Sequence, residues 1–171
     1  MIVNCLSTKF SLHFWCFYSL HGGKMRKLRS EYWDYFTKKD EDGKIKGDGI
    51  KFEELVKCLL TAQYGREWTG TQKSHDDNRD FWIYFKDKHL WAECKNYKDS
   101  IAMNILAPTL VMAHVYEVNE ILFFSRSSIN SSAKNKILAF GEKSNKRILF
   151  FDGENLENLI WTYRDCITKE Y

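Results

Sequence analysis

Residues 71–97 read TQKSHDDNRDFWIYFKDKHLWAECKNY, and this stretch decides how the rest of the chain can be arranged. It contains two short apolar runs, DFWIYF at 80–85 and a second run that leads into ECK at 93–95. Both runs have the length and the aromatic content that are typical of strands. The charged residues KDKH at 86–89 separate them and are suited to a turn. We therefore predict a β-hairpin at the centre of the fold.

The predicted hairpin brings three ionisable side chains to one place. A strand projects alternate side chains to the same face, so Glu93 and Lys95 point together, roughly 7 Å apart, and Cys94 points the other way. Asp80 begins the partner strand and is expected beside Glu93. Two carboxylates and a lysine that converge on a sheet surface indicate a divalent-cation site with a proton-handling group attached.

The clearest helix covers residues 50–64, and Gly65 is suited to end it. Its apolar residues repeat with a helical period and predict one buried face, which comprises Phe52, Leu55, Val56, Leu59 and Leu60. Glu53 lies on the flank of this face. It is either an acid that reaches the site or an ordinary acid near a helix N-terminus, where the helix dipole favours negative charge.

The remaining elements alternate between strand and helix. We expect a short strand near 67–71, buried strands at 121–125 and 147–151, and helices at 100–116, 130–140 and 154–163. Pro108 is expected to kink or interrupt the first of these helices, and Gly141 is expected to end the second. Strands that alternate with helices predict an α/β sheet covered on both sides.

This series of elements resembles the PD-(D/E)xK restriction-endonuclease-like superfamily, in particular its Mrr-type branch, which includes the nuclease domains of type IV restriction enzymes. The resemblance covers about residues 49–165 and is carried by FE at 52–53, DDNRD at 76–80, ECK at 93–95, ILFFS at 121–125 and ILFFDG at 148–153. Asn78 stands where the family usually has glycine, and Arg79 where the name-giving proline often lies. The resemblance implies a three-layer fold with a central mixed β-sheet flanked by helices.

The resemblance also implies a metal-dependent endonuclease that hydrolyses DNA in restriction, as a defence against foreign DNA. Asp80, Glu93 and the backbone carbonyl of Cys94 would bind Mg²⁺, for which Mn²⁺ can substitute. Lys95 would orient or deprotonate the attacking water and steady negative charge. Glu53 would join these residues from its helix.

Several polar residues flank the predicted site. Lys73, Arg79 and Lys98 are candidates to hold the backbone of double-stranded DNA, and the alternative is that they form a solvated rim. Asp76 is assigned to the turn, with a second metal ion as the alternative. Ser125 either contacts a phosphate or forms a hydrogen bond at its strand end.

Two other functions remain open. The first is a nucleic-acid-binding or interaction module on the same fold that does not cut, and the second is a junction-resolving or repair nuclease. The complete set of Asp80, Glu93 and Lys95 favours an active nuclease. We expect a homodimer or a partner subunit to supply target recognition.

The bulk properties are those of a chain with one main domain. With 171 residues, of which 44% are hydrophobic, it can bury a core, which excludes global disorder. The net charge of +3 does not by itself indicate a polyanionic partner. The five cysteines form no C-x-x-C pair, which argues against a zinc ribbon or a disulfide scaffold and favours the cytoplasm.

Three segments are expected. Residues 1–24 form an N-terminal extension whose apolar part is interrupted by His13 and is shorter than the ~20 residues of a membrane-spanning helix. Either translation begins at Met25, or the extension is an anchor or a packing arm. Residues 25–48 form a basic polar arm with a glycine-punctuated loop, and 49–171 form the nuclease domain.

Overall fold

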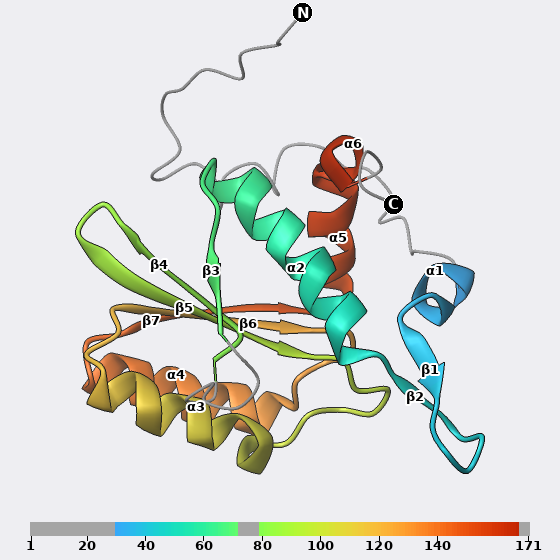
Figure 1. Cartoon of the computed structure of the whole chain (residues 1–171). Coiled ribbons are helices and arrows are strands. Elements are labelled where there is room, and N and C mark those ends of the chain that lie inside the picture. Colours follow the sequence, from blue (N-terminus) through green and yellow to red (C-terminus); the bar gives the residue numbers. More distant parts are fainter. Residues whose placement is uncertain (1–29, 72–78, 168–171) are drawn as a thin grey trace, which may run out of the picture.

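The computed structural model of the chain describes residues 30–71 and 79–167 (Figure 1). A short helix and a two-stranded ribbon precede a larger unit of five strands and helices. The elements are α1 Ser30–Asp34, β1 Thr37–Lys39, β2 Ile45–Gly47, α2 Gly49–Tyr64, β3 Thr69–Gly70, β4 Phe81–Phe85, β5 Lys88–Lys95, α3 Met103–Val115, β6 Glu120–Ser125, α4 Ser131–Lys143, β7 Arg147–Asp152, α5 Glu154–Thr162 and α6 Arg164–Ile167.

The five-stranded sheet is mixed, in the order β3-β4-β5-β6-β7. The hairpin predicted at its centre is present, because β4 pairs with β5 in antiparallel register. β6 and β7 continue from β5 as parallel strands. The carboxyl ends of β5, β6 and β7 therefore lie side by side at one end of the sheet, which we call its carboxyl edge.

Helices cover both faces of the sheet, as predicted: α2 and α5 lie on one face, and α3 and α4 on the other (Figure 1). The alternation of side chains along β5 feeds two separate cores. Ala92 and Cys94 pack in the core that includes α2 and α5. Trp91 packs in the core that includes α3 and α4. Glu93 and Lys95 share the alternation of Trp91 and thus face the α3 and α4 side.

Helix α2 forms as its sequence predicts. The side chain of Asp48 accepts a hydrogen bond from the backbone N–H of Lys51 at the N-terminus, which satisfies a donor that the helix leaves open. Gly65 ends the helix with φ of 66°, a left-handed conformation that suits glycine. The five apolar residues of the predicted stripe are all buried. Because the helix is anchored in this way, its first turn has a defined place at the edge of the sheet.

Two helix predictions need correction. Helix α3 runs through Pro108, so the proline does not interrupt it, and both Pro108 and Asn104 are exposed, so water can satisfy the carbonyl that the missing proline N–H leaves open. Gly141 lies inside α4 instead of ending it. A Cβ at Gly141 would lie 2.9 Å from Ile148 Cδ1, so this glycine allows α4 to approach β7 closely.

The segment expected as a loop before α2 instead forms the ribbon of β1 and β2. The strands pair in antiparallel register, with Lys38 opposite Lys46. The turn closes because Asp40 Oδ1 accepts from the N–H of Lys44 at 2.8 Å, and because Gly43 adopts φ of 75°. Each strand has three residues, which is too short for a period-two pattern to be recognised in the sequence.

In the described ranges, no helix combines the length and the apolar character needed to cross a membrane. The apolar segment at 10–20 lies outside those ranges.

Candidate active site

The hairpin brings Asp80 close to the tripeptide that contains Glu93. The last residue pair between β4 and β5 is Phe81 with Ala92, and Asp80 precedes Phe81 as Glu93 follows Ala92. The N–H of Asp80 donates to the carbonyl of Ala92 at 3.0 Å, and Asp80 Oδ2 accepts from the N–H of Cys94 at 2.6 Å. The Asp80 carboxylate is therefore held against the backbone of the tripeptide that contains Glu93 and Lys95.

Glu93 and Lys95 form an ion pair at the end of β5. Lys95 Nζ donates to Glu93 Oε1, and the side chains are 3% exposed for Glu93 and 24% exposed for Lys95. Burial acts to lower the pKa of Lys95, but the charge and hydrogen bond of Glu93 and the charge of Asp80 outweigh it, so the pKa is raised. Lys95 is therefore a cation at neutral pH, placed to stabilise negative charge.

The Cys94 thiol does not belong to the polar side of this site. It is buried in the core beneath α2. Burial raises the pKa of Cys94 well above its ordinary value, and the charges of Asp80, Glu93 and Glu53 raise it further. The thiol thus stays protonated. The backbone carbonyl of Cys94 points in the same direction as its N–H, and that N–H is bonded to Asp80. The carbonyl oxygen is therefore on the Asp80 side of β5.

Glu53 lies in the first part of α2, partly buried, and close enough to Cys94 for its charge to act on the thiol. The structure therefore brings it near the same end of β5, on the α2 side. Lys98 is exposed a short distance after β5. Lys73 and Asp76 fall outside the described residues.

Arg79 lies among aromatic rings. Its guanidinium is 4.5 Å from the ring centre of Trp91, 5.5 Å from that of Tyr116 and 5.8 Å from that of Trp82. Stacking of this kind stabilises the cation by interaction with the ring faces. It also fixes the residue that immediately precedes Asp80, so the arrangement has a structural role whether or not Arg79 also contacts DNA.

Sequence analysis did not predict a second ion pair with a buried carboxylate at the same edge of the sheet. Asp152, at the end of β7, accepts from Lys134 Nζ at 2.8 Å and from the N–H of Ile129 at 2.6 Å. Ser125 ends β6 opposite Lys95, and its hydroxyl donates to the carbonyl of Ser127 at 2.7 Å. The possible signal was the polar residue at the end of each apolar strand.

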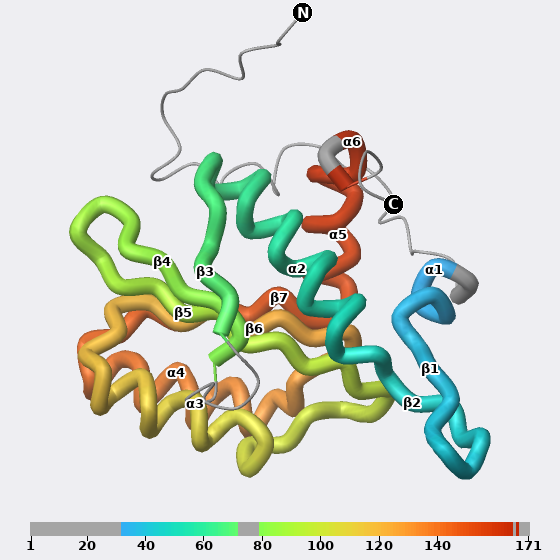
Figure 2. Tube along the Cα trace, in the orientation of Figure 1, coloured from blue at the N-terminus to red at the C-terminus, as the bar shows by residue number. Residues whose placement is uncertain are grey.

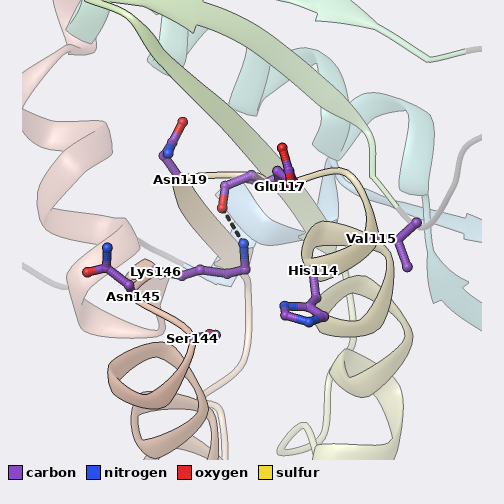
Figure 3. A pocket seen from close by; sticks show the side chains of 8 residues that line it. His114, Val115, Glu117, Asn119, Ser144, Asn145 and Lys146 are labelled. Carbon is purple, nitrogen blue, oxygen red and sulfur yellow. Dashed lines mark hydrogen bonds between the residues drawn. The ribbon is translucent and has the colours of Figure 1, made fainter.

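A pocket lies at the other end of the parallel strands (Figure 3). His114 and Lys146 are among its lining residues, and Lys146 Nζ donates to the carbonyl of Val118 at 2.6 Å. Burial lowers the pKa of Lys146, and the charge of Glu117 opposes that effect. The pocket adjoins the starts of β6 and β7, and Asp80, Glu93 and Lys95 do not line it.

The donors at the Asp80 edge suit a hard cation. In the part of the chain that the structure describes, no three His, Cys, Asp or Glu side chains form a ready-made metal cluster. Two carboxylates and a backbone carbonyl are oxygen donors of the kind that Mg²⁺ or Mn²⁺ accepts together with water. The protonated thiol of Cys94 on the opposite face argues against a soft-metal site.

The chain matches the family Mrr_cat, described as restriction endonuclease, over residues 46–160, which is more than half of its length. A comparison with curated proteins gives no match. Among solved structures, the chain is similar to the DNA modification-dependent restriction endonuclease AspBHI, with 12% identity and a TM-score of 0.48, over 67% of this chain and 31% of that one. It is also similar to the MspJI restriction endonuclease in complex with a 27-mer oligonucleotide, with 13% identity and a TM-score of 0.49, over 77% and 30% of the two chains.

The matched part thus corresponds to less than a third of each of these two proteins. The family match includes α2, the β4–β5 hairpin and the carboxyl edge of the sheet. By this match, and by the mixed sheet flanked by helices, the chain belongs to the Mrr_cat family of restriction endonucleases.

Proposed function

We propose that this protein is a metal-dependent endonuclease that hydrolyses phosphodiester bonds of double-stranded DNA. One observation carries the proposal. The Asp80 carboxylate is bonded to the backbone N–H of Cys94, between Glu93 and Lys95, and these two side chains form an ion pair, in a chain of the restriction endonuclease family. Such a group combines carboxylate oxygens for a divalent cation with a fixed positive charge beside them.

In this proposal Asp80, Glu93 and the Cys94 carbonyl hold Mg²⁺ or Mn²⁺. The ion, when bound, supplies Lewis-acid stabilisation of the phosphate and a more acidic water. Lys95, whose pKa is raised by Glu93 and Asp80 in the metal-free chain, supplies an ammonium group that stabilises the negative charge developing on the phosphate. Its bond to Glu93 holds the ammonium group in position before substrate binds.

Glu53 and the basic residues near the edge have supporting roles in this proposal. Glu53 adds a carboxylate on the α2 side of the same strand end. Arg79 and Lys98 contact the DNA backbone, as does Lys73, which lies outside the described residues. Phosphate contacts position a duplex without reading its sequence, so mutation of these residues should weaken binding to all sequences similarly.

The cellular role proposed is restriction of foreign DNA in the cytoplasm. Cys94 is a free thiol, which fits a reducing compartment. Target recognition comes from a second copy of the chain or from a partner subunit in this proposal. A molar-mass measurement in solution, with and without DNA, tests the dimer directly.

The central test uses supercoiled plasmid, unmodified and cytosine-methylated, incubated with the purified chain in Mg²⁺ or in EDTA. We expect nicked and linear products only with Mg²⁺, and loss of both with Asp80→Ala. The proposal is wrong if neither plasmid is cut by the folded protein. It is also wrong if both Asp80→Ala and Lys95→Ala leave metal-dependent cleavage intact.

A further inference from the structure

The ribbon of β1 and β2 lies beside the carboxyl end of β5 (Figure 2). Asn96, the residue after Lys95, holds it there. Its side-chain Nδ2 donates to the carbonyl of Phe36 at 2.7 Å and to that of Asp48 at 3.0 Å. Phe36 precedes β1 and Asp48 follows β2, so both contacts lie at the root of the ribbon. A Cβ at Gly47 would lie 2.1 Å from the carbonyl oxygen of Asn96, so the ribbon packs directly on the backbone next to the candidate site.

The charges along this ribbon are not explained by folding. Lys38 lies directly opposite Lys46, and like charges at opposed positions destabilise an antiparallel pair. Both lysines are exposed, as are Lys39 and Lys44. Lys38 Nζ approaches Asp48 Oδ1 at 3.8 Å, a long contact in which the Lys38 side chain stays 46% exposed and that of Asp48 is 14% exposed. The ribbon therefore presents closely spaced positive charges to solvent at some cost to its own pairing.

The acidic residues of the ribbon lie elsewhere. Asp40 is used in the turn, where it accepts from the N–H of Lys44, and Asp48 caps α2. Glu41 and Asp42 are exposed at the tip. The charged residues of the two strands are thus all lysines, in a chain whose total charge is +3. We call the opposed pair Lys38 and Lys46 the positive stripe.

We infer that the β1–β2 ribbon is a DNA-backbone contact, with Lys38 and Lys46 on the phosphates of the duplex that is cut at Asp80, Glu93 and Lys95. The inference rests on the proposed function for the place of the cut. The lysine ammonium is a compact charge that suits phosphate without reading bases. Since the family match begins at residue 46, most of the ribbon lies outside the region this chain shares with the family.

The test compares two double variants of the full chain. Lys38→Gln with Lys46→Gln removes the stripe. Lys86→Gln with Lys88→Gln is the matched control, because it removes two exposed lysines from the tip of the β4–β5 hairpin, at the other end of β5, about 23 Å from Lys95. Binding to a mixed-sequence 30-base-pair duplex, unmodified or cytosine-methylated, is measured in EDTA by fluorescence anisotropy over a NaCl series.

We expect the stripe variant to bind roughly tenfold more weakly near 0.1 M salt, with a salt-dependence slope that is smaller by about 2, because two phosphate contacts are lost. The control variant should bind as the unchanged chain does. Glu41→Gln with Asp42→Asn should tighten binding, because it removes negative charge from the tip. None of the three variants should be markedly less stable to heat, since every substituted side chain is exposed, and the stripe variant also loses the repulsion between Lys38 and Lys46.

Each outcome has a separate meaning. Equal losses in the stripe and control variants would overturn the ribbon contact, as would unchanged binding of the stripe variant or no DNA binding by the unchanged chain. If the stripe variant loses affinity but the unchanged chain does not cut plasmid, the ribbon contact stands and the endonuclease proposal fails. If cleavage occurs and the stripe variant binds normally, the endonuclease stands, and the ribbon faces a protein partner or solvent.

Discussion

Two ion pairs, each between a buried carboxylate and a partly exposed lysine, lie at the same edge of the sheet. They differ in the hydrogen bonds that the carboxylate oxygens accept. Glu93 is 3% exposed and pairs with Lys95, and Asp152 is 2% exposed and pairs with Lys134. Asp152 bonds its lysine with one oxygen and the backbone N–H of Ile129 with the other. Glu93 bonds its lysine two residues along the same strand, and a second carboxylate, that of Asp80, accepts from the N–H of the intervening Cys94.

The difference separates a structural pair from a candidate catalytic one. The Asp152 carboxylate joins β7 to α4 and to the segment before α4, so its contacts connect distant parts of the chain. The Glu93–Lys95 pair joins two residues of one strand, and the Asp80 carboxylate is bonded to the N–H of Cys94 between them. Like charges in close proximity cost stability, and such arrangements persist where function requires them.

The largest expected effect separates the pairs by activity. Glu93→Gln should lower the initial rate of plasmid cleavage by about 10³-fold, because it removes a proposed metal ligand and the partner of Lys95. Asp152→Asn should retain a rate of the same order as the unchanged protein, once the rate is divided by the folded fraction. A larger loss with Asp152→Asn than with Glu93→Gln would reverse the assignment.

Stability should separate the pairs in the opposite direction. Asp152→Asn should lower the free energy of unfolding by about 2–3 kcal/mol, because it weakens one buried and one part-buried hydrogen bond and removes a charge partner. Glu93→Gln should cost less than about 1 kcal/mol, because relief of repulsion with Asp80 offsets the lost ion pair. Urea unfolding at pH 7 without metal gives both values. Equal costs would show that Glu93 is also a structural residue.

Metal binding should distinguish the pairs through thermal stability. At ten times its dissociation constant, Mg²⁺ should add about 1.4 kcal/mol, or roughly 3–5 °C, to the unchanged protein. The shift should vanish in Glu93→Gln and in Asp80→Ala, and it should persist in Asp152→Asn. A shift that survives in the first two variants would place the ion elsewhere.

The smallest expected effect is a change of stability with pH at a third polar contact, between Trp91 and His89 on β5. This contact is separate from both ion pairs and serves as a reference for them. Trp91 Nε1–H donates to His89 Nε2 at 2.8 Å, so that nitrogen must be unprotonated. Burial lowers the pKa of His89, and the charge of Arg79 acts in the same direction. The unfolded chain then binds the proton more readily, so stability should fall as pH drops from about 6.5 through the lower folded pKa.

Urea unfolding between pH 7 and pH 5 measures this effect, with His89→Gln as the control. The control should lose part of the pH dependence of the unchanged protein. Identical pH profiles for the two proteins would remove His89 from the explanation.

The sequence predicted the parts of the site that depend on strand period. Alternation along one hairpin places Glu93 and Lys95 on one face and Cys94 on the other, and pairing of the two strands brings Asp80 to the same end of β5. The Asp152–Lys134 pair was missed because it depends on how α4 packs against β7, which local periodicity does not specify. Gly141 was assigned to a helix end for the same reason, since its role is close packing on Ile148.

The ribbon was missed because its strands are too short to show a pattern, and because a turn with Asp40 and Gly43 also suits a loop. Its place beside β5 comes from Asn96, whose contacts with Phe36 and Asp48 span long distances in the sequence. Contacts of that range are set by the complete fold.

The most direct test of the central claim is plasmid cleavage by Lys95→Ala and Lys134→Ala side by side, in Mg²⁺ and in EDTA, with rates divided by the folded fraction. The two lysines are similarly exposed, at 24% and 28%, and each pairs with a buried acid at the end of a strand. We predict that Lys95→Ala loses metal-dependent cleavage and that Lys134→Ala keeps it. Cleavage that survives in Lys95→Ala, or that is lost in Lys134→Ala alone, would contradict the account.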